Sequence, residues 1–244
     1  MYNYKIVIEY DGTNYVGWQH QLNGRSIQKS IEEALFKLTG ENISIFGAGR
    51  TDAGVHAMAQ VASFKLKKKF SNKVIRDGLN QHLRPELISI QKSYQVDNEF
   101  HARFSAKKRW YEYRIINRRP PLTLDFNRAW CVHKKLNLEL IKKQLPFFYG
   151  KQDLNAFRSS HCQSKTSIKT IDSFCLKKDS EGIIFSVSAK SFLHSQVRIM
   201  VGTLVDIGKG NLQKTIKEII NSKNRELAGQ TAPACGLYLK KIDY

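Results

Sequence analysis

The segment Tyr4–Glu9 reads YKIVIE, a short β-branched run that ends at Asp11-Gly12 and predicts a strand entering a turn. A helix is predicted next. Ser26 is a suitable N-cap, and Gly40 lies where glycine is favoured just past a helix. Between them, apolar residues recur at helical spacing: Ile27, Ile31, Ala34, Leu35 and Leu38.

The rest of the first half continues this alternation. Strands are predicted for ISIFG from Ile43, for MAQVASFKL at residues 58–66 and for LISIQKSYQV at residues 87–96. A second helix is predicted from Ser71 to the stop at Arg84-Pro85, with apolar residues on one face. The predicted order is β-α-β-β-α-β.

The second half repeats that order with longer connections. Strands are predicted over residues 109–117, 168–177, 182–190 and 236–244, and helices over 138–149 and from about Leu193. Residues 211–228 form an insertion that is predicted to be helical. Two split β-α-β units predict an α+β fold with two ferredoxin-like or RRM-like halves, mainly antiparallel sheets and helices on one side.

The boundary between the halves is predicted near residues 99–107, which divides the chain into 1–104 and 105–244. No Pro/Gly/Ser-rich linker occurs there, so we expect the halves to pack rigidly around a central basic cleft.

Charge indicates an acidic partner. The 244 residues contain 40 Lys and Arg against 21 Asp and Glu, a formal charge of +19. Such a charge attracts polyanions, with nucleic acid ahead of anionic membrane.

Membrane and secreted classes are excluded by pattern. No apolar run approaches the roughly 18 to 20 residues of a membrane span, and no secretory signal is visible at the start, so a cytoplasmic protein is expected. The four cysteines form no C-x-x-C pair, so we expect reduced thiols and no metal site.

The segment Gly47–Ala57, GAGRTDAGVHA, surrounds charged side chains with small residues. Small residues let a ligand approach Asp52 closely, and Arg50 is near enough in sequence to keep the carboxylate ionised. A tight hairpin with an ordinary Arg-Asp pair is an equally good interpretation at this point.

The segment Arg103–Arg114 interleaves basic and aromatic residues, a pattern suited to phosphate contacts beside stacked bases. In a strand, Tyr111 faces the side opposite to Trp110, and it either packs in the core or meets a ligand. The basic residues expected to contact RNA are Arg103, Lys107, Lys108 and Arg109.

Arg198 follows an apolar stripe in FLHSQVRIMVG. Such an arginine usually lies at a solvated flank with its stem on apolar surface. If it points into the cleft instead, it needs a carboxylate partner, for which Asp52 is a candidate. The seven histidines show no ligand-like spacing, and each taken alone is interpreted as structural or exposed.

At GRTDAGVHA, residues 49–57, the chain resembles TruA-type tRNA pseudouridine synthases. The resemblance extends over nearly the whole chain, through YDGTNYVGWQ, FHARFSAKKRWYEYRI, CQSKT, FLHSQVRIMVG and APACGLYL. It implies that Asp52 is the catalytic residue, that Tyr111 is the active-site tyrosine and that Arg198 is the arginine of the cleft. Trp110 stands where family members often have a basic residue.

The resemblance also implies the reaction and the partners. The expected activity is isomerisation of uridine to pseudouridine at positions 38, 39 and 40 of the tRNA anticodon arm, with no cofactor or metal. The expected assembly is a homodimer in which tRNA, rather than DNA, contacts both subunits.

These roles agree with the chemistry. A uridine in or beside a stem must be flipped out, and Tyr111 would stack on it. Asp52 would attack C1′ or act as the base that generates a glycal, and the sequence does not separate these routes. Arg198, with Arg50, would keep the carboxylate ionised, although Arg50 could instead contact phosphate. Tyr111 could also relay the C5 proton.

Two other classes of protein share some of these features. Two RRM-like units would also describe a non-catalytic RNA-binding protein, but a pure binder gains nothing from a carboxylate where RNA must approach. Zinc-dependent base deaminases need H-x-E and P-C-x-x-C, and neither pattern occurs here.

Overall fold

The computed structural model describes residues 1–22, 24–160, 162–180 and 182–244. It divides into two compact units: Met1–Lys107 together with Tyr238–Tyr244, and Lys108–Leu237. Each unit contains helices and a mainly antiparallel sheet, so the predicted α+β class is confirmed.

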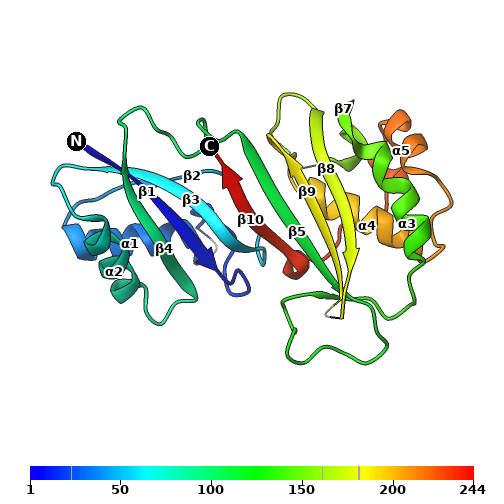
Figure 1. Cartoon of the computed structure of the whole chain (residues 1–244), viewed down its shortest axis with the longest axis horizontal. Coiled ribbons are helices and arrows are strands. Elements are labelled where there is room, and N and C mark those ends of the chain that lie inside the picture. The colour runs from blue at the N-terminus through cyan, green and yellow to red at the C-terminus, as the bar shows by residue number, and fades with distance from the viewer. Residues whose placement is uncertain (23, 161, 181) are drawn as a thin grey trace. The chain divides into compact units, whose positions relative to one another are not determined.

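The first unit has the predicted β-α-β-β-α-β order (Figure 1). Its elements are β1 (Tyr2–Tyr10), α1 (Ile27–Thr39), β2 (Phe46–Gly47), β3 (His56–Leu66), α2 (Asn72–Leu83) and β4 (Ile88–Val96). Strand β1 lies between β4 and β3 and is antiparallel to both, and β2 pairs with β3. Ser26 and Ser71 cap the two helices by accepting bonds from backbone N–H groups, as their N-cap positions predict.

The core of this unit follows from the alternation of β1. Tyr4, Ile6 and Ile8 are fully buried on the face that the helices cover, whereas Val7 packs with Ala48 and Val61 on the other face. A sheet with apolar material on both faces can bury a long segment against the side that has no helices. Here that segment is the stretch after β4, through Phe100 and Ala102.

The second unit contains a sheet in the order β5-β9-β8-β7, with antiparallel neighbours throughout. Its strands are β5 (Lys108–Ile116), β6 (Trp130–Cys131), β7 (Gly150–Asp153), β8 (Ile168–Lys178) and β9 (Ile183–Ala189). Its helices are α3 (Leu138–Gln144), α4 (Gln196–Gly208) and α5 (Ile216–Ser222). Four core rings lie in successive contact in the order Phe157, Phe148, Phe174 and Phe185, with centroids 5.1 to 6.0 Å apart.

Three predicted elements are shorter than expected, each for a local reason. The strand from Ile43 is reduced to β2, because the Glu32 carboxylate of α1 takes the backbone N–H of Ile45 at 3.0 Å. The helix predicted to Tyr149 ends at Gln144 and continues as a 3₁₀ turn over Leu145–Phe148, since Pro146 cannot continue an α-helix. Of the insertion, only α5 and a short 3₁₀ turn are helical.

The final strand, β10 (Leu237–Asp243), forms where it was predicted but pairs with β3 of the first unit, in parallel, through Tyr238 and Leu239. Sequence analysis placed it as the closing strand of the second half. The choice of partner depends on a contact between distant segments, which the alternation of a single strand does not encode.

Candidate active site

The loop predicted to carry the chemistry connects β2 to β3 in the first unit, and its backbone is held from several sides. The N–H of Ala48 donates to Val61 O at 2.8 Å, and the N–H of Val55 donates to Asp52 O at 3.2 Å. The buried amide of Gln60 donates to Gly49 O at 2.9 Å. Asp52 is half-buried, and the loop that carries it is held in place by hydrogen bonds to the adjacent strand β3 and within the loop.

A second loop, residues 11–18, lies against the Asp52 loop. The N–H of Trp18 donates to Thr51 O at 3.1 Å. A Cβ on Gly17 would lie 2.6 Å from that same oxygen, and one on Gly12 would lie 2.0 Å from Val55 O. Only glycine permits this approach, so the YDGTNYVGWQ segment is shaped to hold the backbone on either side of Asp52.

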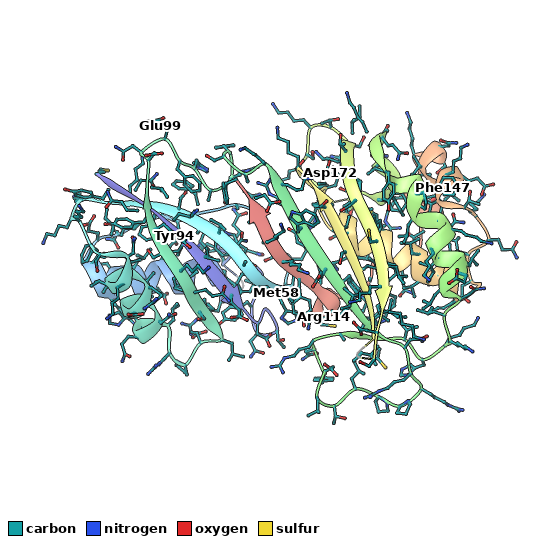
Figure 2. All side chains as sticks on the ribbon, viewed as in Figure 1. Met58, Tyr94, Glu99, Arg114, Phe147 and Asp172 are labelled. Atoms are coloured by element: carbon teal, nitrogen blue, oxygen red, sulfur yellow. The ribbon has the colours of Figure 1, made fainter. Side chains whose placement is uncertain are left out.

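His56 connects the same two loops, and sequence analysis did not identify it as a site residue. It is 2% exposed, and its Nδ1 lies 3.0 Å from the N–H nitrogen of Gly12 and 3.2 Å from Asp11 Oδ1. Its ring stacks on Tyr238 of β10 with centroids 4.7 Å apart. The available signal was its position four residues after Asp52, at the first residue of β3. Figure 2 labels Met58, two residues further along that strand.

The 11–18 loop is itself anchored by charge. The Tyr15 hydroxyl donates to the Glu86 carboxylate, which also pairs with Arg25 at 2.7 Å. Burial raises the pKa of the Tyr15 phenol above its ordinary value, and the hydrogen bond to Glu86 adds to the effect. Tyr15 therefore stays protonated and remains a donor to Glu86 at neutral pH.

Tyr111 and Tyr113 lie in β5 of the second unit, opposite Val187 and Phe185 of β9. Both tyrosines are buried, and the Tyr111 ring meets Phe192 edge-on at 5.3 Å. The Tyr113 hydroxyl donates to Pro233 O at 2.7 Å. Burial raises the pKa of Tyr113 well above its ordinary range, the Cys235 thiolate would add to this rise, and the nearby Arg198 charge opposes it.

Arg198 lies in the first turn of α4 and is half-buried. Its Nε donates to Ala232 O at 2.8 Å, and the N–H of Ala232 donates back to Arg198 O at 3.1 Å. Its charge acts on both Tyr113 and Cys235, so this unit brings Arg198 close to Tyr113 of β5. Arg198 is therefore not simply a solvated flank residue, because its Nε is bonded to a backbone carbonyl and its side chain is half-buried.

The predicted RNA-contacting residues differ in their surroundings. Lys108 forms an ion pair with Asp172 at 3.1 Å and lies 5.6 Å from the ring centre of Trp110. Arg109 donates to Lys190 O. Lys107 and Arg103 are exposed in the first unit, and Arg103 lies over the Phe104 ring.

The predicted site residues are thus divided between the units. Arg50, exposed, and Asp52 belong to the first, and Tyr111 and Arg198 belong to the second. The four cysteines are free thiols, as predicted. Within the described ranges, no three His, Cys, Asp or Glu side chains gather as metal ligands do. The described helices include none with the length and apolar character needed to cross a membrane.

The site thus consists of a carboxylate held in a tightly ordered loop of small residues, in a chain with a charge of +19 that suits a polyanionic partner. Comparison with known proteins agrees. The model of a family described as tRNA pseudouridine synthase matches residues 6–105 and 147–244. The chain belongs to the tRNA pseudouridine synthase family, whose members are isomerases.

Its relatives share this assignment over their full length. The chain is 49% identical over 243 residues to tRNA pseudouridine synthase A of Ehrlichia chaffeensis, with 99% of each chain covered. It is 48% identical to the protein of that name from Anaplasma phagocytophilum, again with 99% of each covered. The identity to the Parvibaculum lavamentivorans protein of that name is 44%, with 100% of each covered.

Proposed function

We propose that this protein converts uridine to pseudouridine in tRNA, at positions 38, 39 and 40 of the anticodon arm. The observation that carries the proposal is Asp52, a carboxylate in a small-residue loop that two other segments hold in place. Chemistry at C1′ of a nucleoside needs a fixed carboxylate and room for the sugar beside it, and small neighbours leave that room.

The reaction is an isomerisation in which no atom is added. The C1′–N1 bond breaks, the uracil turns while bound, and a C1′–C5 bond forms. C5 loses a proton and N1 gains one, so the product has the composition of the substrate. Asp52 would act as the nucleophile at C1′ or as the base that leads to a glycal, and both routes use the same carboxylate.

Tyr111 is proposed to stack on the flipped uracil and to take or relay the C5 proton. Base flipping costs a few kcal/mol, which stacking on an aromatic ring recovers in part. The contact of Tyr111 with Phe192 supports this role, because an edge-on neighbour fixes the plane of the ring before substrate binds.

Arg198 is proposed to favour the ionised form of Asp52 when substrate is bound, and Arg50 to support it or to contact the RNA backbone. The bond from Arg198 Nε to Ala232 O supports such a role, since it orients the guanidinium before substrate arrives, and the bond from the Ala232 N–H to Arg198 O holds the two backbones together. Surface cations such as Lys107 would contact phosphates, with Arg103, Lys108 and Arg109 nearby in sequence.

We propose further that the protein is cytoplasmic and acts as a homodimer whose two subunits both contact one tRNA. Sedimentation of the protein alone and with tRNA tests this assembly. One dimer bound to one tRNA is expected, and a monomer that turns over at the full rate would contradict it.

The experiment that tests the function is pseudouridine mapping at single-nucleotide resolution in a tRNA transcript incubated with purified protein and no added cofactor. We expect modification confined to positions 38–40. A transcript in which cytidine replaces uridine at those three positions is the control, and it should remain unmodified. Binding of tRNA without any product would favour the non-catalytic alternative.

A further inference from the structure

Three rings form a row on the surface of the first unit, and nothing in the proposed chemistry uses them. The rings of Phe46 and His101 have centroids 5.1 Å apart, and those of His101 and Phe104 are 4.5 Å apart. Phe46 is 53% exposed and Phe104 76% exposed, which is unusual for large apolar side chains. We call Phe46, His101 and Phe104 the aromatic row.

The segment that carries His101 and Phe104 is held by one hydrogen bond to the sheet and by two within the segment. The N–H of Ala102 donates to Ser63 Oγ of β3 at 3.0 Å, and the N–H of Ser105 donates to His101 O at 2.9 Å. The N–H of Arg103 donates to His101 Nδ1 at 3.1 Å, which sets the orientation of the imidazole. Because these contacts exist already, a ring of a ligand could stack without ordering the loop first.

A cavity of about 530 Å³ opens beside the aromatic row, and its lining includes Phe46 and His101 of the row together with Phe100. The Phe100 ring packs against Tyr244, with ring centroids 5.0 Å apart, and Lys5 Nζ lies 5.6 Å from the Phe100 ring centre. The segment after β4, on which Figure 2 labels Glu99, forms part of the wall. The volume lies in the range of small-ligand sites.

The polar lining of the cavity combines two amides and two lysines, which a nucleotide could use, with the carboxylates of Glu41 and Glu99. Asn42 and Asn98 are exposed amides, and an amide can donate to and accept from the edge of a base. Lys65 and Lys67 supply cations for a phosphate. The carboxylate of Glu41 accepts the backbone N–H of Lys67 at 3.2 Å and is thereby engaged within the protein.

We infer that the aromatic row and its cavity bind an unpaired nucleotide of the RNA substrate, at a place separate from the reacting uridine. The base would stack on Phe104 or Phe46, and its phosphate would face the two lysines or Arg103, whose guanidinium lies 5.7 Å from the Phe104 ring centre. Cations around exposed rings favour a nucleic acid over an apolar protein surface. The inference rests on the proposed tRNA substrate.

Binding to Phe104 variants tests the inference without turnover. All variants carry Asp52→Asn, and the affinity for full-length tRNA is measured by fluorescence anisotropy over a range of salt concentrations. Phe104→Ala is expected to weaken binding about 5- to 100-fold with an unchanged salt slope, because stacking releases no counterions. Phe104→Trp should restore binding, and its added fluorescence should be quenched by tRNA.

Phe36→Ala is the matched control, since Phe36 is an exposed phenylalanine on α1 of the same unit. It should leave the affinity unchanged. Lys67→Ala should weaken binding and reduce the salt slope by about one, as loss of a phosphate contact does.

Three results would overturn the inference. Unchanged affinity in Phe104→Ala would show that the row does not stack on RNA. A change in sedimentation without a change in RNA affinity would show instead that a second copy of the chain covers it. If Phe104→Ala weakened tRNA binding and Phe104→Trp did not restore it, the loss would be due to damage to the loop rather than to lost stacking. None of these results depends on whether pseudouridine forms, which the mapping experiment decides separately.

Discussion

Asp11 Oδ1 lies 3.2 Å from His56 Nδ1, and the same ring nitrogen lies 3.0 Å from the backbone nitrogen of Gly12. A neutral Nδ1 accepts the N–H of Gly12, whereas a protonated Nδ1 donates to Asp11. In both states the imidazole ties the 11–18 loop to the first residue of β3. His56 is thus a positioning residue for the loop that carries Asp52.

We therefore expect His56→Ala to lower kcat about 10- to 100-fold with little change in KM, because Asp52 would be less well placed while the RNA surface is intact. His56→Asn should recover part of kcat, since its Oδ1 can accept the Gly12 N–H. Steady-state kinetics with tRNA measure both. The control is His82→Ala, which alters an exposed histidine of α2. Equal losses in the Ala and Asn variants would contradict the role.

Asp52→Asn should abolish product and retain tRNA binding. The amide has the size of the carboxylate but is a far weaker nucleophile and base, so we expect a loss of about 10³-fold or more in kcat. Product is measured by pseudouridine mapping and binding by anisotropy. If the Asn variant turned over at a rate near that of the wild type, Asp52 would have no catalytic role.

Tyr111→Phe separates stacking from proton transfer. The ring and its edge-on contact with Phe192 remain, and only the hydroxyl is lost. If the hydroxyl relays the C5 proton, single-turnover rates should fall about 100-fold while tRNA affinity is kept. Tyr113→Phe is the control on the same strand, and it should cost about 1 kcal/mol of stability through the lost bond to Pro233. Wild-type rates in Tyr111→Phe would leave Tyr111 a stacking role alone.

Arg198→Ala should lower kcat more than affinity, because the charge is proposed to act on Asp52 rather than on the RNA backbone. We expect a loss of about 10- to 100-fold in kcat, or about 1.4 to 2.7 kcal/mol. Arg198→Lys keeps the charge but loses the Nε bond to Ala232, so its kcat should lie between those of the wild type and of Arg198→Ala. Losses of equal size in kcat and affinity would point to an RNA contact.

Because of Asp153, the stability of the second unit is expected to fall as the pH becomes acidic. The Ser167 hydroxyl, at 2.5 Å, lowers the pKa of Asp153, burial opposes this, and Lys223 at 3.3 Å lowers it further. A lowered pKa means that the ionised group stabilises the fold above its unfolded pKa of about 3.9, and that this contribution disappears as the pH falls through the folded-state value.

Asp153→Asn should therefore reduce stability at neutral pH by no more than about 1 kcal/mol, since the pair is partly solvated. The difference from wild type should shrink as the pH falls below about 3.9 and disappear once the pH is below the lowered folded-state pKa, where both side chains are neutral. Urea unfolding at neutral pH and over a series of acid pH values measures it.

Helix caps and strand alternation could be predicted from the sequence, because residues close together in the chain decide them. The caps Ser26 and Ser71 and the alternation of β1 depend on hydrogen bonds and burial within a few residues, and they were predicted correctly. The strand from Ile43 was overestimated because Glu32, distant in sequence, takes its backbone N–H. Contacts between loops leave no periodic pattern in the sequence, so the close approach of Gly12 and Gly17 to the backbone of the Asp52 loop was not predicted.

By itself the sequence determined the class of fold, the polyanionic partner and, through its resemblance to a family, the residues that are proposed to carry the chemistry. These properties depend on residue type, spacing and charge, which are present in the chain before it folds. Only the tertiary structure decided that β10 joins β3, that His56 connects two loops and that Phe46, His101 and Phe104 form one row. Each of these is a contact between segments far apart along the chain, and such contacts exist only once the core has brought the segments together.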